Sequence, residues 1–134
     1  LVIGDYIHIG GFGFIQCAAK ITLEDFVNIS QGVRIYAGSD DYSGETMTNP
    51  MIPSELTSVE KGPVTIGRHT IVGTGSVILP NVTIGEGCAI GALSLVKADL
   101  SEWGIYAGAP VKKVKERSKN LLEFERKLKE GRPC

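Results

Sequence analysis

Few side chains in this chain of 134 residues have the types and spacing that catalysis or metal binding requires. Its two histidines, His8 and His69, are far apart in the sequence. Its three cysteines are odd in number and equally scattered: Cys17, Cys88 and Cys134. No Cys-x-x-Cys or Cys/His spacing occurs, which argues against a disulfide framework and a zinc site. We therefore expect no metal, and we expect a reducing cytoplasm as the location.

The densest group of charged side chains is basic and lies in the segment VKKVKER. Lys112, Lys113, Lys115 and Arg117 would fall in the first turns of a predicted helix, where the helix dipole favours acidic residues instead. A phosphate-bearing ligand would explain this placement through charge-assisted hydrogen bonds. A solvated charged face is the alternative. With a formal net charge of −1, the chain as a whole does not favour nucleic-acid binding.

A scaffold for these side chains is indicated by a repeat of six residues. Between residues 64 and 97 an aliphatic residue recurs at this spacing and is usually followed by glycine: Ile66, Val72, Ile78, Ile84, Ile90 and Val96. Stepping backward by sixes gives a second series: Val33, Val27, Ile21, Ile15, Ile9 and Ile3. This period fits neither an amphipathic helix nor a simple alternating strand.

A fixed period over twelve units predicts an all-β solenoid, because each unit must stack on its neighbours to bury its apolar face. Period six suits short strands joined by tight corners, where a glycine after the aliphatic residue relieves crowding. Three hexads per triangular coil would give four coils. A β-sandwich is the alternative, but nothing would keep it in one register over twelve units. The length fits one domain.

Two segments break the rhythm. Residues 39–65 contain Pro50, Pro53 and Pro63, which predicts a loop that projects from the solenoid. We favour a functional loop over a decorative insertion, although loops also tolerate variation. From residue 112 to residue 130 the apolar residues follow a helical stripe. We expect residues 1–111 to form the solenoid, and residues 112–134 to form a helix and tail that cover the open end of the last coil.

The sequence gives no indication of a membrane span or of a signal peptide at its start. No apolar run reaches the length of a membrane span, so no membrane insertion is expected. The start, LVIGDYIHIG, lacks the basic region of a signal peptide. Because the chain begins without methionine and already in register, we expect that an N-terminal segment is missing.

The units IGRHTI, VGTGSV, IGEGCA and IGALSL resemble those of the hexapeptide-repeat acyltransferases over nearly all of the chain. The ending EWGIYAGAPVKKVKER is similar to that of the sugar O- and N-acetyltransferases of the galactoside and bacterial surface-polysaccharide type. The resemblance implies a left-handed parallel β-helix, a homotrimer with active sites between subunits, and acetyl-CoA as the acyl donor. A carbonic anhydrase of the same fold is not expected, because it needs three histidines around its metal.

The resemblance also assigns residues to coenzyme A. Family positions that contact the pantetheine arm or the phosphates correspond here to eight residues: Thr74, Ala92, Lys97, Ala107, Gly108, Lys112, Lys113 and Lys115. The small residues at corners would leave space for the arm, and the backbone of YAGAP would take its far part. The lysines would then bind the phosphates. The family loop reaches a neighbouring subunit and helps to wall the acceptor site.

On the acceptor side, Asp40 stands where galactoside and maltose acetyltransferases have a histidine as general base. An ordinary exposed aspartate is too weak a base to take a proton from a hydroxyl during attack. Two further acceptor positions hold Gly10 and Ala18, whose side chains cannot bind a sugar hydroxyl. We therefore expect the acceptor atom to be an amine, which Asp40 or Asp41 would orient while receiving charge.

The histidines lead to separate hypotheses. His8, in GDYIHIG, matches a short sequence of a related branch that acetylates nucleotide-linked amino sugars, so it is a candidate base or substrate ligand. We expect His69 to be solvated on the outer face. The predicted function is an acetyl-CoA-dependent acetyltransferase acting on an amino sugar or a nucleotide-linked amino sugar. The alternatives are a sugar O-acetyltransferase with a histidine base and a non-catalytic trimeric scaffold.

Overall fold

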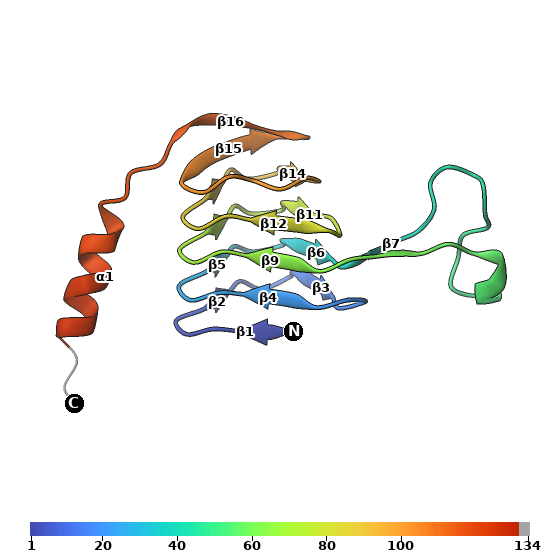
Figure 1. Ribbon diagram of the computed structural model, residues 1–134, viewed down its shortest axis with the longest axis horizontal. Coiled ribbons are helices and arrows are strands. Elements are labelled where there is room, and N and C mark those ends of the chain that lie inside the picture. The colour runs from blue at the N-terminus through green and yellow to red at the C-terminus, as the bar shows by residue number, and fades with distance from the viewer. Residues whose placement is uncertain (132–134) are drawn as a thin grey trace.

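Three walls of short parallel strands form a stack of coils in a computed structural model, which describes residues 1–131 (Figure 1). Sheet A contains β1 (Val2–Ile3), β4 (Ile21–Leu23), β9 (Val64–Ile66) and β12 (Val82–Ile84). Sheet B contains β2 (His8–Ile9), β5 (Asn28–Ile29), β10 (Ile71–Val72), β13 (Ala89–Ile90), β15 (Gly104–Gly108) and β16 (Val111–Glu116). Sheet C contains β3 (Phe14–Gln16), β6 (Arg34–Tyr36), β11 (Val77–Ile78) and β14 (Leu95–Val96). The predicted solenoid with four coils is confirmed, and β15 adds a further strand to sheet B.

The remaining elements lie outside this stack. The projecting loop begins with β7 (Gly38–Ser39), contains the 3₁₀ helix η1 (Ser54–Leu56) and returns through β8 (Glu60–Lys61). The C-terminal helix α1 spans Leu121–Glu130. No helix within residues 1–131 is long and apolar enough to cross a membrane.

The core is a ladder of aliphatic side chains that point inward from each sheet. In sheet A, Leu23 pairs with Ile66 and Ile66 with Ile84, and all three are fully buried. The three-residue strands of sheet A, such as Val64–Ile66, bury both end residues and turn only the middle one outward. This sheet therefore contributes two inward columns per coil, which helps to explain why so short a repeat can build a core.

One step of the predicted repeat is out of register. We expected Ile21 to continue the anchor series from Ile3, but Ile3 pairs with Leu23, two residues later. Ile21 pairs instead with Val64 and so belongs to the second inward column. Burial was predicted correctly for Ile21, but its place in the series was wrong, because the first coil contains two additional residues before β4.

Corner positions on the edge between sheets A and B carry aromatic residues in the left-handed backbone region. Tyr6, Phe26 and His69 have φ values of 58°, 62° and 59°. The Tyr6 ring stacks on Phe26 at 4.9 Å, and Phe26 stacks on His69 at 4.7 Å between centroids. Such pairs are worth about 0.5–1.5 kcal/mol beyond burial, which offsets the backbone strain. The expectation that His69 is solvated is wrong, because Phe26 and α1 cover its ring.

The C-terminal segment differs from the prediction in two ways. Residues 112–116 belong to β16, which pairs antiparallel with β15, so the helix begins only at Leu121. The helix also lies alongside the stack and does not cover its end (Figure 1). Trp103 and Tyr106 are buried near that end instead. The predicted tail after Gly131 lies outside the described residues.

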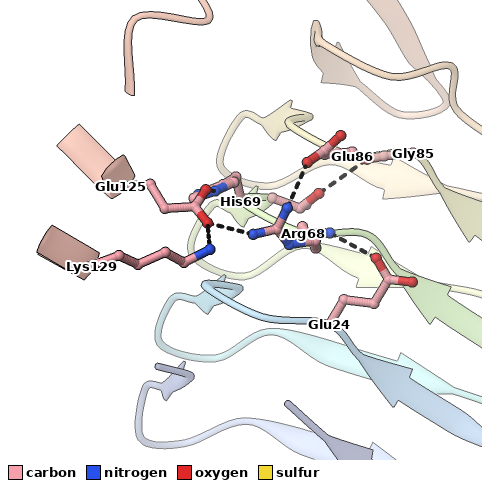
Figure 2. Close-up of polar contacts among 8 residues, drawn as sticks. Glu24, Arg68, His69, Gly85, Glu86, Glu125 and Lys129 are labelled. Carbon is pink, nitrogen blue, oxygen red and sulfur yellow. Dashed lines mark hydrogen bonds and ion pairs between the residues drawn. The ribbon is translucent and has the colours of Figure 1, made fainter. Parts of the chain in front are cut away.

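The contacts between α1 and the coils converge on the carboxylate of Glu125 (Figure 2). It accepts hydrogen bonds from Lys129 at 2.5 Å and Arg68 at 2.6 Å, and it lies 2.5 Å from Nε2 of His69. Arg68 also contacts Glu86 at 3.4 Å. The hydrogen bond with Lys129, followed by those with His69 and Arg68, lowers the pKa of Glu125 to about 2. This cluster fastens the helix to the corner.

Replacing Glu125 with glutamine is expected to lower the free energy of unfolding at pH 7 by about 1–2 kcal/mol, because it removes the negative charge that Arg68 and Lys129 share. Since the folded pKa lies below the ordinary carboxyl value of 4.5, this stabilisation is complete above pH 4.5 and is lost as the pH falls toward 2. Urea unfolding at several pH values should show the difference between wild type and Glu125→Gln shrinking across this window. Glu123→Gln, at an exposed ion pair on the same helix, is the control and should change little. A constant difference from pH 7 to pH 2.5 would contradict the assignment.

Candidate functional site

A cavity of about 730 Å³ lies between the outer face of sheet C and the projecting loop. The sheet contributes five residues from three successive coils: Gln16, Arg34, Tyr36, Val77 and Leu79. The loop contributes the opposite wall, including Asp40, Tyr42, Ile52 and Val59. The cavity thus combines apolar walls with a few polar groups, which is the usual composition of a small-molecule site.

Strand alternation determines which side chains reach this cavity. In β6, Ile35 points inward and is fully buried, so Arg34 and Tyr36 must point outward. Val77 pairs with Arg34 in the next coil, and Ile78 occupies the inward place beside Ile35. The floor of the cavity is therefore a direct consequence of the repeat, because every inward anchor has outward neighbours.

The β7–β8 ladder forms a narrow neck at the base of the loop and positions the loop over this floor. Gly38 pairs with Lys61 in the antiparallel β7–β8 ladder. Asn81, at a corner of the stack, donates a hydrogen bond of 2.9 Å to the side chain of Glu60. A side chain on Gly38 would place its Cβ 2.8 Å from the Cβ of Ala18, so the close approach requires glycine. The neck fixes where the loop leaves the stack.

The two adjacent aspartates at the start of the loop have different roles. The carboxylate of Asp41 accepts hydrogen bonds from the backbone N–H and hydroxyl groups of Ser43 and Thr46, at 2.5–2.9 Å. These bonds, Ser43 first, hold the pKa of Asp41 well below its usual range. Asp41 is therefore hydrogen-bonded within the loop, and its role beside the acceptor stays a prediction. Asp40 lines the cavity, and its carboxylate accepts no hydrogen bond from residues 1–131.

The structure does not bring His8 into this cavity. His8 lies on the outer face of sheet B in the first coil, with Nδ1 2.8 Å from Oδ1 of Asn28. Asp40 follows sheet C and the loop neck, so the two candidate bases lie on different faces of one chain. Among residues 1–131, no three His, Cys, Asp or Glu side chains are placed to hold a metal ion.

Comparisons with known proteins agree with this architecture. The family model of bacterial transferase hexapeptide (six repeats) matches residues 58–98. A solved structure of AntD, an N-acyltransferase from Bacillus cereus, in complex with dTDP-4-amino-4,6-dideoxyglucose and coenzyme A, superposes with a TM-score of 0.96 at 39% identity, covering 98% of this chain and 71% of that one. The chain belongs to the hexapeptide-repeat transferase family.

Two other relatives of this hexapeptide-repeat transferase differ in their sequence identity to it. A dTDP-4-amino-4,6-dideoxy-D-glucose acyltransferase from Escherichia coli is 49% identical over 123 residues. That match covers 92% of this chain and 64% of the E. coli enzyme, so the chain spans less than two thirds of that relative. A maltose O-acetyltransferase from Clostridium difficile 630 has a TM-score of 0.64 at 23% identity, covers 89% of this chain and shares the fold.

In this family member, the residues assigned to coenzyme A follow one corner of the stack. Thr74 and Ala92 lie at equivalent exposed turns between sheets B and C, one coil apart. Ala107 comes next, since a Cβ on Gly91 would lie 3.3 Å from its Cβ. The N–H of Gly108 donates to the Ser94 hydroxyl at 3.3 Å. These residues line the corner beside sheet C as expected. Their contact with coenzyme A stays a prediction.

The lysines assigned to coenzyme A fall in two places. Lys97 follows β14 at the other edge of sheet C. Lys112, Lys113 and Lys115 lie on β16, the edge strand of sheet B, so the argument from a helix dipole does not apply to them. The ammonium group of Lys113 binds the carboxylate of Glu116, which raises the pKa of that lysine. Lys112 and Lys115 are exposed on this strand.

Sequence reasoning missed the residues on the floor of the cavity. Arg34, Tyr36 and Gln16 were not singled out, because their positions look like ordinary outward places in a hexad. Gln16 has a buried Oε1 without a hydrogen-bond partner among the described residues. Their spacing could have identified them. Arg34 and Tyr36 flank the inward Ile35 in the last strand before the loop, and Gln16 follows the inward Ile15 in the strand below it.

Proposed function

We propose that this protein transfers an acyl group from acyl-CoA to the amine of a sugar carried on a nucleotide. Acetyl-CoA is the expected donor. The observation that carries the proposal is Asp40, whose carboxylate has no hydrogen-bond partner within residues 1–131 and lines the cavity of about 730 Å³ between sheet C and the loop. The E. coli acyltransferase is named for a dTDP-linked amino sugar, and AntD was solved in complex with one, so both likenesses support the same acceptor class.

The spacing of two residues gives further support. The solved structures of AntD include variants of one serine and of an aspartate ten residues later in that enzyme. In this chain Ser30 and Asp40 have the same separation, and no other serine here is followed at ten residues by an aspartate. Asp40 is thus the aspartate that we expect to act beside the acceptor.

The proposed chemistry uses the chain mainly to position and to accept charge. A thioester supplies an activated carbonyl carbon, and a neutral amine is already a competent nucleophile. The amine nitrogen forms the new bond to that carbon, the carbon–sulfur bond breaks, and the proton leaves the nitrogen for the thiolate, directly or through water. Asp40 orients the amine and balances the positive charge that develops on the nitrogen.

The proposal includes an assembly. Ser30 lies on the outer face of sheet B, whereas Asp40 follows sheet C, so one chain does not bring the two together. We propose a homotrimer of left-handed coils, in which the sheet B face of one copy meets the cavity of its neighbour. The two cysteines in the described residues, Cys17 and Cys88, are free, which suits the proposed cytoplasmic location.

The proposal is tested by incubating the purified protein with acetyl-CoA and a dTDP-linked 4-amino sugar, followed by mass spectrometry of the products. The expected result is a sugar nucleotide heavier by one acetyl group, with the group on nitrogen. Binding of acetyl-CoA without any acetylated product, across amino and hydroxyl acceptors, would contradict the enzyme and favour the scaffold alternative. Light scattering on the same sample should give the mass of three chains.

A further inference from the structure

Arg34 stands out among the arginines of residues 1–131 because no group in that part of the chain binds its side chain. Within residues 1–131, Arg68 pairs with glutamates, Arg117 donates to three backbone carbonyls, and Arg126 pairs with two glutamates of its helix. The guanidinium of Arg34 has no hydrogen bond or ion pair in that part of the chain. It nevertheless lies on the floor of the cavity beneath the loop.

The surroundings of Arg34 do not explain its charge. Its neighbours in the same outward column are Phe14 in the coil below and Val77 in the coil above. Tyr36 lies two residues along the strand, and its ring packs against Phe14 with centroids 5.7 Å apart. A guanidinium carries five donors in a fixed fork that fits phosphate or carboxylate. A guanidinium without a partner in residues 1–131, beside the apolar and aromatic side chains of its column and facing a cavity, indicates an anionic ligand.

Two charged side chains line the cavity in the part of the chain that the structure describes. Among the residues that line it, Arg34 is the one cation and Asp40 the one anion. No ion pair joins them, and five residues, 35–39, separate them in the chain. The side chains of Leu79, Ile52 and Val59 line the space with them. A ligand with an anionic group and an amine matches these two charges, and the polar side chains Gln16, Asn49 and Thr57 also line the space for its hydroxyl or carbonyl groups.

We propose that Arg34 binds the diphosphate of the nucleotide-linked acceptor and thereby selects nucleotide-linked over free amino sugars, an inference that rests on the function proposed above. The diphosphate supplies the anion, and its bidentate contact with the guanidinium fixes the register of the acceptor in the cavity. The sugar then lies over Tyr36 and Leu79, and its amine faces Asp40. Arg34 is a specificity-determining residue and takes no part in bond formation.

The test is isothermal titration calorimetry of the full chain with dTDP, comparing wild type with Arg34→Gln and Arg34→Lys. Arg34→Gln is expected to weaken dTDP binding by about 10- to 100-fold, because a charge-assisted pair of hydrogen bonds is lost. Arg34→Lys should recover part of this loss, since charge returns without the fork. Affinity for coenzyme A should stay within twofold. Arg126→Gln removes the same charge at an exposed helix position and should leave dTDP affinity unchanged.

Steady-state kinetics separate this inference from the function on which it rests. Arg34→Gln should raise KM for the dTDP-linked acceptor while kcat stays within about threefold, and turnover of the free amino sugar should be unaffected. Wild-type affinity for dTDP in Arg34→Gln would overturn the inference and leave the acyltransferase intact. Failure of the wild-type protein to bind dTDP, together with acylation of free amino sugars, would also overturn it. Loss of all acyl transfer in the wild type would refute the proposed function itself.

Discussion

Asp40→Asn is expected to lower kcat for acyl transfer to the amine by about 100-fold, the lower range for loss of one positioned electrostatic contact to the transition state. The substitution keeps the size and one acceptor oxygen but removes the negative charge that balances the developing ammonium. Because Asp40 makes no side-chain hydrogen bond within residues 1–131 and is exposed in the cavity, the free energy of unfolding should change by less than about 0.5 kcal/mol. Stopped assays of acylated product, with urea unfolding of the same samples, measure both quantities.

Two variants make this result specific. Glu55→Gln removes an exposed carboxylate from η1 of the same loop and should leave kcat unchanged. Asp41→Asn replaces one of the two carboxylate oxygens that accept from Ser43 and Thr46 with a donor NH2 group, so it should loosen the loop and raise KM for the sugar more than it lowers kcat. Wild-type kcat in Asp40→Asn, with Asp41→Asn inactive and stably folded, would move the functional carboxylate from residue 40 to residue 41.

Gly73→Val should abolish the fold at the corner where coenzyme A is expected. A Cβ on Gly73 would lie 2.5 Å from the backbone nitrogen of Ala92, a distance that the next coil cannot accept without moving. We expect a loss of about 3–5 kcal/mol in the free energy of unfolding, a large part of the stability of a typical domain. Gly11→Val is the matched control, because no atom lies within 4 Å of the Cβ it would add.

Circular dichroism and urea unfolding of the two glycine variants provide the measurement. Gly73→Val should be insoluble or should unfold at a much lower urea concentration, and Gly11→Val should unfold like wild type. Equal midpoints for both variants would mean that the coils can separate at this corner, which would contradict the close approach of Gly73 to Ala92.

The solenoid was predictable because its signal is redundant. Anchors such as Ile66, Val72 and Ile78 recur at one spacing and are all buried, so a single exception could not hide the repeat. The register of the first coil was not predictable, since the extra residues before Ile21 leave another aliphatic residue at the expected place. Both Ile21 and Leu23 point inward, and only strand pairing distinguishes them.

The C-terminal segment shows a different limit. Residues 112–116 fit a helical stripe, but they form β16 because β15 offers an unpaired edge, and antiparallel pairing with this preceding strand overrides local periodicity. The position of α1 depends on Glu125 meeting Arg68 and His69, which are far from it in the sequence. No local pattern contains that information.

Prediction of the site was uneven for similar reasons. Asp40 was identified through a family position, and the structure places it in a cavity. Arg34 has no motif and is noticed only when the partners of every arginine are compared in space. Asp41 looked equivalent to Asp40 in the sequence, but the hydroxyl groups of Ser43 and Thr46 turn its carboxylate toward the loop.

The most direct measurement is release of free thiol from acetyl-CoA, with a dTDP-linked 4-amino sugar and its 4-hydroxyl counterpart assayed in parallel. Wild type is expected to release thiol with the amino sugar alone, Asp40→Asn to do so about 100-fold more slowly, and His8→Ala to match wild type. Turnover of the hydroxyl sugar alone, abolished by His8→Ala, would contradict acylation of an amine and would instead identify a histidine-based O-acetyltransferase.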